Sequence, residues 1–298
     1  DNRKGHLRIL SYNVDAFSSV KKQKQITLYL RTQHIDACAL QETKTPLEQD
    51  KNVGGYRFIC TQANQIKYQN GGHHHSGGVG LLLSPDLKVV NINRIMCNIM
   101  DIHLVLPDKR EAHFVVAYAP QNGARGPEPL TYWKTLKETL WALRKDNTLL
   151  FTDANARIGS DMNEEYDQVG LNLLSEKTNN NGKLLVGACS DYKICNTHFK
   201  QNKQHTYSFT NYNTLQHSQI DYVAASEACA TNILNCKVMH HYTMGKNVRE
   251  THHGHSPILT KYKLYYRDPR KAKRRKEDAD KRFPYNREVI RVAANTII

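Results

Sequence analysis

The stretch GVGLLLSPDLKVVNINRIMCNIMDIHLVLPDKREAHFVVAYA (78–119) decides the fold class, because it places four apolar runs in close succession. The runs are rich in Val, Ile and Leu, and only a few residues separate each from the next, which is typical of strands. A parallel pair needs a crossover of about a dozen residues or more, so these strands should be antiparallel. We predict strands at Gly78–Ser84, Leu87–Ile92, Ile99–Leu106 and His113–Ala119.

The rest of the first 265 residues also predicts more strands than helices. His6–Val14 alternates apolar and polar residues, which favours a strand with Leu7, Ile9 and Val14 in the core. Further strands are predicted at Asp36–Gln41, Tyr56–Thr61, Thr148–Thr152, Tyr192–Asn196, Tyr207–Thr210, Ile220–Ala224 and Ile258–Leu264. Apolar residues at helical spacing predict helices at Val20–Thr32, Pro129–Lys145 and Gly182–Asp191.

Many antiparallel strands with three helices predict an α/β fold, in which two mostly antiparallel sheets pack face to face and helices flank them. One domain should span residues 1–265, and residues 266–298 should form a basic C-terminal segment. Its RKAKRRK run (270–276) includes Arg274 and Arg275 and suits nucleic-acid binding or nuclear localisation. A solvated charge run is the alternative. Residues 283–298 could form a helix that leads to a region missing downstream.

The composition limits the class of partner. Among 298 residues, 42 Lys and Arg stand against 28 Asp and Glu, a net charge of +14, and half of this excess lies in residues 261–282. Such a balance favours polyanions, nucleic acid first. Seven scattered Cys favour reduced intracellular thiols, and no apolar run is long enough for a membrane span. The chain starts Asp-Asn-Arg-Lys without Met or a secretory signal, so we expect an excerpt of a longer reading frame. The RKAKRRK run favours a nuclear location.

Polar side chains that suit metal and acid–base chemistry follow the ends of predicted strands. Hydrolysis of a phosphodiester needs a nucleophilic water, stabilisation of charge at the phosphate and help for the leaving oxygen. Mg²⁺ takes oxygen ligands, usually one or two carboxylates completed by water and substrate phosphate. The sequence offers suitable groups at Asn13, Asp15, Glu42, Tyr118, Asp153, Asn155, Asp221 and His255.

Seven short motifs carry a family resemblance across residues 7–264: LRILSYNVD (7–15), ACALQETK (37–44), GGVGLLL (77–83), VVAYAP (115–120), LLFTDANARIG (149–159), SQIDYV (218–223) and GHSPI (254–258). In their identity and order the sequence resembles the endonuclease/exonuclease/phosphatase superfamily, which includes apurinic/apyrimidinic endonucleases and DNase I. The resemblance implies a DNase I-like four-layer α/β sandwich. NTHFKQNKQHTYSF (196–209) is similar to the endonuclease domain of LINE-type (non-LTR) retrotransposons. That domain precedes a reverse transcriptase region, for which this chain is too short.

The resemblance implies a metal site at the ends of the first two strands. Glu42 would be the principal Mg²⁺ ligand, with Asn13 and Asp15 close to the metal. The family usually has Ser-Asp-His before its last strand, whereas this chain has His253-Gly254-His255. One carboxylate is therefore missing, which predicts weakened or shifted metal binding. His253 could supply a nitrogen ligand, which would suit Mn²⁺ better than Mg²⁺.

The same resemblance implies the catalytic roles. Asp153 would orient or deprotonate the attacking water, and Asn155 would fix Asp153 and the phosphate. Tyr118 would donate a hydrogen bond to a phosphate oxygen. Asp221 would hydrogen-bond His255 and hold it against the scissile phosphate, since a carboxylate sets the tautomer and favours the imidazolium.

Each of these residues also has an ordinary structural interpretation. The alternatives are a strand-end surface acid for Glu42, a loop bridge for Asn13, an Asx-turn for Asp153 and Asn155, a turn cap for Asp221, core packing for Tyr118 and a structural role for His255.

Two further segments suggest contacts with nucleic acid. Basic and aromatic residues between 196 and 209 suit a hairpin that touches phosphates or wedges into a groove, and an ordinary exposed hairpin is the alternative. In NGGHHHSGG, glycines flank three histidines, which predicts a mobile exposed loop rather than a metal site. Phosphate contact near the rim of the substrate site is the alternative. The predicted DNA-binding residues are Asn196, Lys200, Lys203, His205, Tyr207, Arg274 and Arg275.

We therefore expect a Mg²⁺-dependent endonuclease that nicks DNA by phosphodiester hydrolysis, in the context of target-primed retrotransposition. Two alternatives stay open. One is a phosphatase of inositol lipids or a deadenylase from the same superfamily. The other is a weakened or inactive nucleic-acid-binding domain, suggested by Gly254, for which restoring the carboxylate by Gly254→Asp should raise activity.

Overall fold

The computed structural model describes residues 5–67, 71–124, 126–163, 165–240 and 254–265. Its larger sheet has seven strands in the order β16-β18-β1-β2-β7-β4-β3. β1 (His6–Asn13) pairs in parallel with β2 (Ala37–Gln41) and antiparallel with β18 (Ile258–Lys263). The other strands are β3 (Gln49–Val53), β4 (Tyr56–Cys60), β7 (Val79–Leu83) and β16 (Ile233–Val238).

The second sheet has six strands in the order β12-β15-β11-β10-β9-β8. Successive strands β8, β9 and β10 pair antiparallel, as residues 78–119 predict, whereas β10 and β11 are parallel because a helix joins them. The six strands are β8 (Lys88–Met96), β9 (Ile99–Val105), β10 (Glu111–Tyr118), β11 (Thr148–Asp153), β12 (Tyr192–Ile194) and β15 (Asp221–Ser226).

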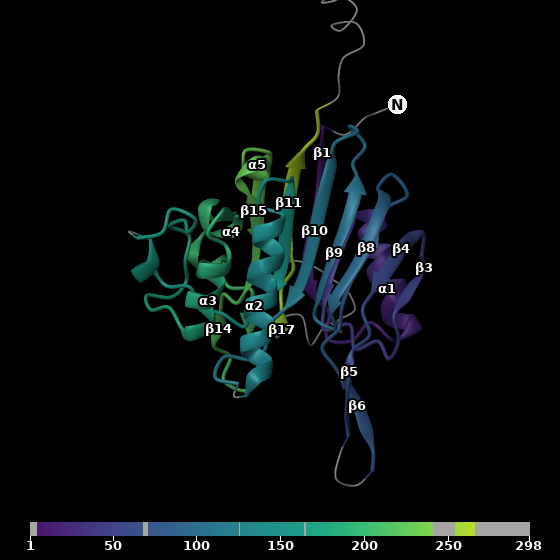
Figure 1. Cartoon of the computed structure of the whole chain (residues 1–298), viewed down its shortest axis with the longest axis horizontal. Helices are drawn as coiled ribbons and strands as arrows, with labels where there is room; N and C mark the ends of the chain where they lie inside the picture. The colour runs from purple at the N-terminus through teal and green to yellow at the C-terminus, as the bar shows by residue number, and fades with distance from the viewer. Residues whose placement is uncertain (1–4, 68–70, 125, 164, 241–253, 266–298) are drawn as a thin grey trace, which may run out of the picture. The chain divides into compact units, whose positions relative to one another are not determined.

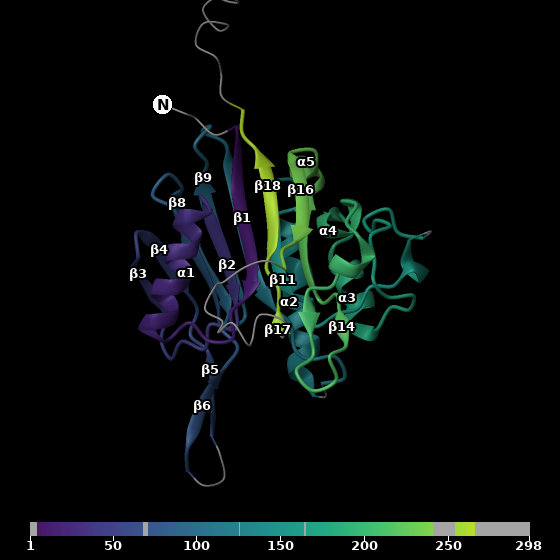
Figure 2. The ribbon, with the colours of Figure 1, turned by 180° about the vertical axis from the view of Figure 1, so that it is seen from behind.

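Helices cover the outer faces of the two stacked sheets (Figures 1 and 2). α1 (Val20–Thr32) buries Ile26 and Leu30 against the first sheet. α2 (Pro127–Ala142) and α3 (Asn180–Ala188) cover the second, where Leu136 and Leu140 belong to its apolar cluster. Between the sheets, the rings of Phe114 and Phe151 meet at 5.5 Å. The predicted sandwich of two mostly antiparallel sheets flanked by helices is confirmed.

Small elements complete the fold. β13 (Phe209–Thr210) pairs with both β14 (His217–Ser218) and β17 (Gly254–His255). β5 (Asn64–Lys67) and β6 (His73–Ser76) form a separate two-stranded sheet. Short helices are α4 (Cys195–His198), α5 (Glu227–Ala230), η1 (Ser160–Met162) and η2 (Lys203–His205). None of the described helices has the length and apolar character needed to cross a membrane.

Several local predictions are wrong. The histidines of NGGHHHSGG lie in strand β6, because backbone pairing with β5 orders a segment that its flanking glycines suggest is a loop. The expected hairpin over residues 196–209 is instead α4, η2 and the start of β13. Helices α1 and α2 each expose one leucine, since Leu28 is 54% exposed and Leu130 is 71% exposed. His253 and the basic segment 266–298, with Arg274 and Arg275, lie outside the described residues.

Candidate active site

Two parallel strand pairs end at the same edge of the sandwich, where a cleft opens. Asn13 at the end of β1 pairs with Gln41 at the end of β2, and Tyr118 of β10 pairs with Asp153 of β11. Strand β15 begins at this edge, with Asp221 opposite Asp153. The cleft has a volume of about 540 Å³. Strand register thus gathers side chains that are far apart in the sequence.

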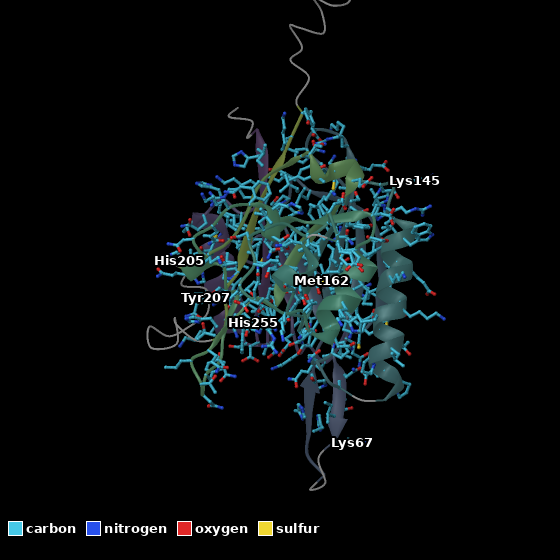
Figure 3. All side chains as sticks on the ribbon, turned by 90° about the vertical axis from the view of Figure 1, so that its left-hand side faces the viewer. Lys67, Lys145, Met162, His205, Tyr207 and His255 are labelled. Carbon is cyan, nitrogen blue, oxygen red and sulfur yellow. The ribbon has the colours of Figure 1, made fainter. Side chains whose placement is uncertain are left out.

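Seven of the eight residues predicted for metal binding and catalysis line this cleft. The eighth, Asp221, is buried behind His255 and hydrogen-bonds it. His255 is labelled in Figure 3. The lining residues from the predicted set are Asn13, Asp15, Glu42, Tyr118, Asp153, Asn155 and His255.

The backbone is unusual around the cleft. Asp15, Glu42, Lys44 and Asn155 have φ angles of 45°, 52°, 51° and 44°. Side-chain-bearing residues seldom adopt this left-handed region, and such strained positions cluster at functional sites. The turns after β1, β2 and β11 therefore aim these polar groups at a cost in backbone energy.

Glu42 forms the carboxylate corner of the cleft. Its Oε1 accepts hydrogen bonds from the Tyr118 hydroxyl at 2.6 Å and from Asn13 Nδ2 at 3.3 Å. Burial raises the pKa of Glu42, but the hydrogen bond from Tyr118 and the charge of Lys44 outweigh it, so the pKa lies below its usual value. Glu42 is thus held ionised and ready to attract a cation.

A cation already lies between two carboxylates of this corner. Lys44 Nζ is 2.5 Å from Asp15 Oδ1 and 3.1 Å from Glu42 Oε2. Burial raises the pKa of Asp15, and the hydrogen bond and charge of Lys44 bring it below the usual value. An ammonium held by two converging carboxylates shows that the corner favours positive charge. Its oxygen donors fit Mg²⁺, which takes carboxylates and keeps several waters.

Asp153 lies deeper and is 1% exposed. Its Oδ2 accepts from Asn13 Nδ2 at 2.8 Å, and its Oδ1 accepts from the backbone N–H of Asn155 at 3.0 Å. The Asn155 side chain donates to the Ala119 carbonyl at 2.8 Å, which fixes the turn. Burial and then the neighbouring charge of Asp221 raise the pKa of Asp153 to about 7. A carboxylate with this pKa suits a general base near neutral pH.

His255 lies between two carboxylates. Its Nδ1 is 3.0 Å from Asp221 Oδ2, and its Nε2 is 3.6 Å from Asp153 Oδ2. Burial lowers the pKa of His255, but the charges of Asp221 and Asp153 outweigh burial and raise the pKa to about 9. The ring is therefore held as an imidazolium, with Asp221 setting its orientation.

The group Asp153, Asp221 and His255 also places ligand-type atoms within 4.8 Å of one another, which is compatible with a metal ion. A protonated imidazole has no lone pair for a metal, and both carboxylates favour that protonated form. The same three residues therefore suit proton transfer, and the Glu42–Asp15 corner suits the hard cation. Asn13 hydrogen-bonds Glu42 on one side and Asp153 on the other. It therefore separates the Glu42–Asp15 corner, a candidate cation site here called the metal corner, from the group of Asp153, Asp221 and His255.

Gly254, at the position of the missing carboxylate, is buried in β17 and has φ = 77°. It pairs with Thr210 of β13 and lines the cleft. Glycine adopts this conformation readily, so the backbone at Gly254 carries no strain.

The predicted DNA-binding residues divide into two groups. Lys200, Lys203 and His205 are exposed, and Tyr207 is half-buried, with its ring stacked on His217 at 3.8 Å. The prediction for Asn196 is wrong. This side chain is 2% exposed, donates to the Asp221 carbonyl and accepts from the backbone N–H of Val223, so it braces β15.

Several residues that line the cleft were not predicted from the sequence. Asn211 and Tyr212, in the turn between β13 and β14, line it together with Lys22 and Gln121. Lys44 bonds two of the predicted metal-site residues. Lys44 could have been predicted as a site residue, because it lies two positions after Glu42 in the sequence. Tyr212 could not, because it reaches the cleft through the pairing of β13 with β17.

Solved structures of related folds were compared with the chain. The endonuclease domain of TRAS1, a telomere-specific non-LTR retrotransposon, is similar with TM-score 0.59 and 15% identity, covering 87% of this chain and 99% of that one. The AP endonuclease LMAP from Leishmania major gives TM-score 0.60 and 14% identity, covering 87% and 88%. An AP endonuclease from Archaeoglobus fulgidus gives 0.61 and 11%, covering 86% and 99%. At these identities the likeness shows the fold alone.

Sequence comparison supplies the family. No curated protein matches the chain significantly. Residues 10–237, about three quarters of the chain, match the sequence pattern of the Endonuclease/Exonuclease/phosphatase family. The matched segment contains seven of the eight predicted catalytic and metal-site residues, all but His255. The chain therefore belongs to the Endonuclease/Exonuclease/phosphatase family.

Proposed function

We propose that this protein is a Mg²⁺-dependent endonuclease that nicks DNA by hydrolysing a phosphodiester bond. The observation that carries the proposal is the division of one cleft into a cation-attracting corner at Glu42 and a proton-transfer group at Asp153 and His255. Metal-dependent phosphodiester hydrolysis needs both parts. Target-primed retrotransposition, a reverse transcriptase region downstream and a nuclear location are the context we propose.

The chain's own residues divide the work as follows. Glu42 and Asp15 would hold the metal, whose charge would stabilise the phosphate oxygens. Asp153 would accept the proton of the attacking water. His255, held as an imidazolium by Asp221, would donate to an oxygen of the phosphate. The Tyr118 hydroxyl donates to Glu42 in this structure. It lines the same cleft, so it would be a further hydrogen-bond donor to a phosphate oxygen.

DNA is the proposed substrate class because the chain carries a net charge of +14 and because basic and aromatic residues line the cleft. Among the lining residues are Lys22, Asn211 and Tyr212. Cations there contact phosphates, and an exposed ring such as Tyr212 can pack on bases or sugars.

Nicking of supercoiled plasmid tests the proposal directly. We expect relaxed circles with Mg²⁺ or Mn²⁺ and none with EDTA. Parallel reactions with soluble inositol phosphates and with polyadenylate distinguish the phosphatase and deadenylase alternatives. Release of phosphate or adenylate with no plasmid nicking would overturn the endonuclease in favour of the corresponding alternative.

Asp221→Asn is expected to move the alkaline limit of nicking to lower pH. Because the carboxylates hold the pKa of His255 at about 9, wild-type nicking should fall as pH rises through that value. Loss of one carboxylate lowers the pKa of the imidazolium, so the fall should begin roughly 1–3 pH units earlier. Initial nicking rates between pH 6 and pH 10 measure the shift, and coincident profiles would contradict the role given to Asp221.

Lys44→Met is expected to tighten metal binding by several-fold, up to about tenfold, because the ammonium competes with the metal for Asp15 and Glu42. Titration calorimetry with Mn²⁺ measures the affinity without relying on activity. Lys24→Met is the matched control, because Lys24 is an exposed lysine of α1 that does not line the cleft. Equal affinities for Lys44→Met and wild type would show that Lys44 does not compete.

A weakened or inactive binding domain is the second candidate, and Gly254 is the observation that favours it. Gly254→Asp should raise nicking if the missing carboxylate limits the rate, at a cost of about 1–2 kcal/mol for a side chain at φ = 77°. Gly254→Asn supplies the same backbone strain without the charge. Nicking rates at saturating Mg²⁺, with melting temperatures, separate the two effects. An equal rate for Gly254→Asp and wild type would rule out this explanation.

A further inference from the structure

The hairpin of β5 and β6, here called the arm, leaves the fold at its catalytic end. Figures 1 and 2 show it projecting beyond the end of the sandwich at which β14 and β17 lie. Figure 3 shows Lys67 on this projection, farther out than His255. Each strand has four residues, so the two strands extend about 13 Å at 3.3 Å per residue.

The base of the arm is tied to the metal corner. Gly77 and Gly78, with φ angles of 74° and 79°, connect β6 to β7. Their carbonyls accept hydrogen bonds from the backbone N–H groups of Lys44 at 2.9 Å and Thr43 at 3.0 Å. Thr43 directly follows Glu42, so backbone bonds fix where the arm starts relative to the metal corner.

The surface of the arm suits a polyanion. All residues of β5 are exposed, as is His73, and the other three residues of β6 are partly exposed. The sequence has no Asp or Glu from residue 51 to residue 85. An isolated two-stranded hairpin is marginally stable in water. A partner that covers the arm would therefore add to its stability.

One face of the arm carries its donors together. Lys67 pairs with His73 across the strands, and Gln65 pairs with His75. Paired residues share a face, and the rings of His73 and His75 lie 5.8 Å apart on it. Ammonium, amide and imidazole groups bond phosphate oxygens and the edges of bases.

We propose that the arm lies in the major groove of the duplex beside the nicked phosphate and helps to choose where the enzyme cuts. The inference rests on the proposed function. The major groove, about 12 Å wide, admits a two-stranded ribbon. An arm about 13 Å long would cover about four base pairs at 3.4 Å each. DNA bound in the cleft would then be held at two places, the catalytic cleft and the arm.

The test compares the triple variant Lys67→Ala, His73→Ala, His75→Ala with wild type. The matched control is Lys88→Ala, Asn91→Ala, Asn93→Ala on exposed positions of β8. Fluorescence anisotropy gives affinities for a 30-base-pair duplex and for a short duplex that ends just past the mapped nick on the flank where the wild-type arm protects guanine N7. Protection of guanine N7 from dimethyl sulfate reports the major groove. A variant with residues 64–76 replaced by Gly-Ser-Gly removes the whole arm.

We expect the arm variants to bind the long duplex about tenfold or more weakly. The slope of log affinity against log salt concentration should fall in magnitude by about one, because Lys67 is removed. The short duplex should be bound and nicked as by wild type, and protection of guanine N7 on one flank should disappear. Unchanged affinity, protection and nick positions would overturn the inference while leaving the endonuclease intact. Failure of wild type to bind either duplex would overturn both.

Discussion

Asp153→Asn is expected to slow DNA nicking by about 10²–10⁴-fold, the usual contribution of a general base. An amide keeps the size of the carboxylate but cannot accept the proton of the attacking water. Asn13 and the backbone of Asn155 donate to Asp153, and one of these bonds would lose its acceptor. Because the proton acceptor is lost, the rate of the chemical step should fall.

The fold should survive this substitution. Burial and the charge of Asp221 raise the pKa of Asp153 to about 7, so the folded state disfavours its charge above that pH. A neutral amide removes that cost, but it also leaves one buried donor without an acceptor and removes a charge beside the His255 imidazolium. Because these effects oppose each other, we expect a melting temperature at pH 8 close to that of wild type. Single-turnover nicking and thermal unfolding give the two quantities, with the exposed Asp86→Asn as control. A variant that nicks at the wild-type rate would remove Asp153 from the mechanism.

Glu42→Gln is expected to reduce nicking at fixed Mg²⁺ on the order of 10³-fold, because a metal that stabilises phosphate charge contributes several kcal/mol and each 1.36 kcal/mol is a factor of ten. The amide keeps an oxygen for the Tyr118 hydroxyl but loses the charge that attracts the cation. Affinity for Mn²⁺ should weaken together with the rate.

Glu138→Gln, on an exposed position of α2, is the matched control. Calorimetry with Mn²⁺ and nicking across Mg²⁺ concentrations distinguish two outcomes. Recovery at high Mg²⁺ would mean that Glu42 serves binding alone. Wild-type affinity and rate in Glu42→Gln would place the metal elsewhere, with the group of Asp153, Asp221 and His255 as the next candidate.

Strand ends were the informative part of the sequence. Apolar runs predict where β1, β2, β10 and β11 stop, and the polar residue after each run enters the shared edge of the sandwich. Their meeting in one cleft depends on two parallel pairings, which helices α1 and α2 make possible. Local pattern and family order therefore suffice for the main site residues.

Residues whose surroundings come from distant pairing were not predictable in this way. Asn196 has the polarity of a surface residue, yet its amide satisfies the backbone of β15 in the interior. Tyr212 joins the cleft because β13 pairs with β17, two elements separated by more than forty residues. The segment of β6 forms a strand because its backbone pairs with β5, whereas its glycines and histidines alone favour a loop.

The left-handed backbone at Asp15, Glu42, Lys44 and Asn155 bears on how this site can change over generations. Glycine would relieve the strain at each position, so selection for stability alone would favour its appearance there. At Glu42 or Asn155 that change would erase a functional side chain, and retention of the strained residues would require selection for activity. Gly254, which lines the same cleft with φ = 77°, is already the residue type that this conformation favours. A lineage released from selection for activity would drift toward glycine at these turns while its two sheets stayed intact.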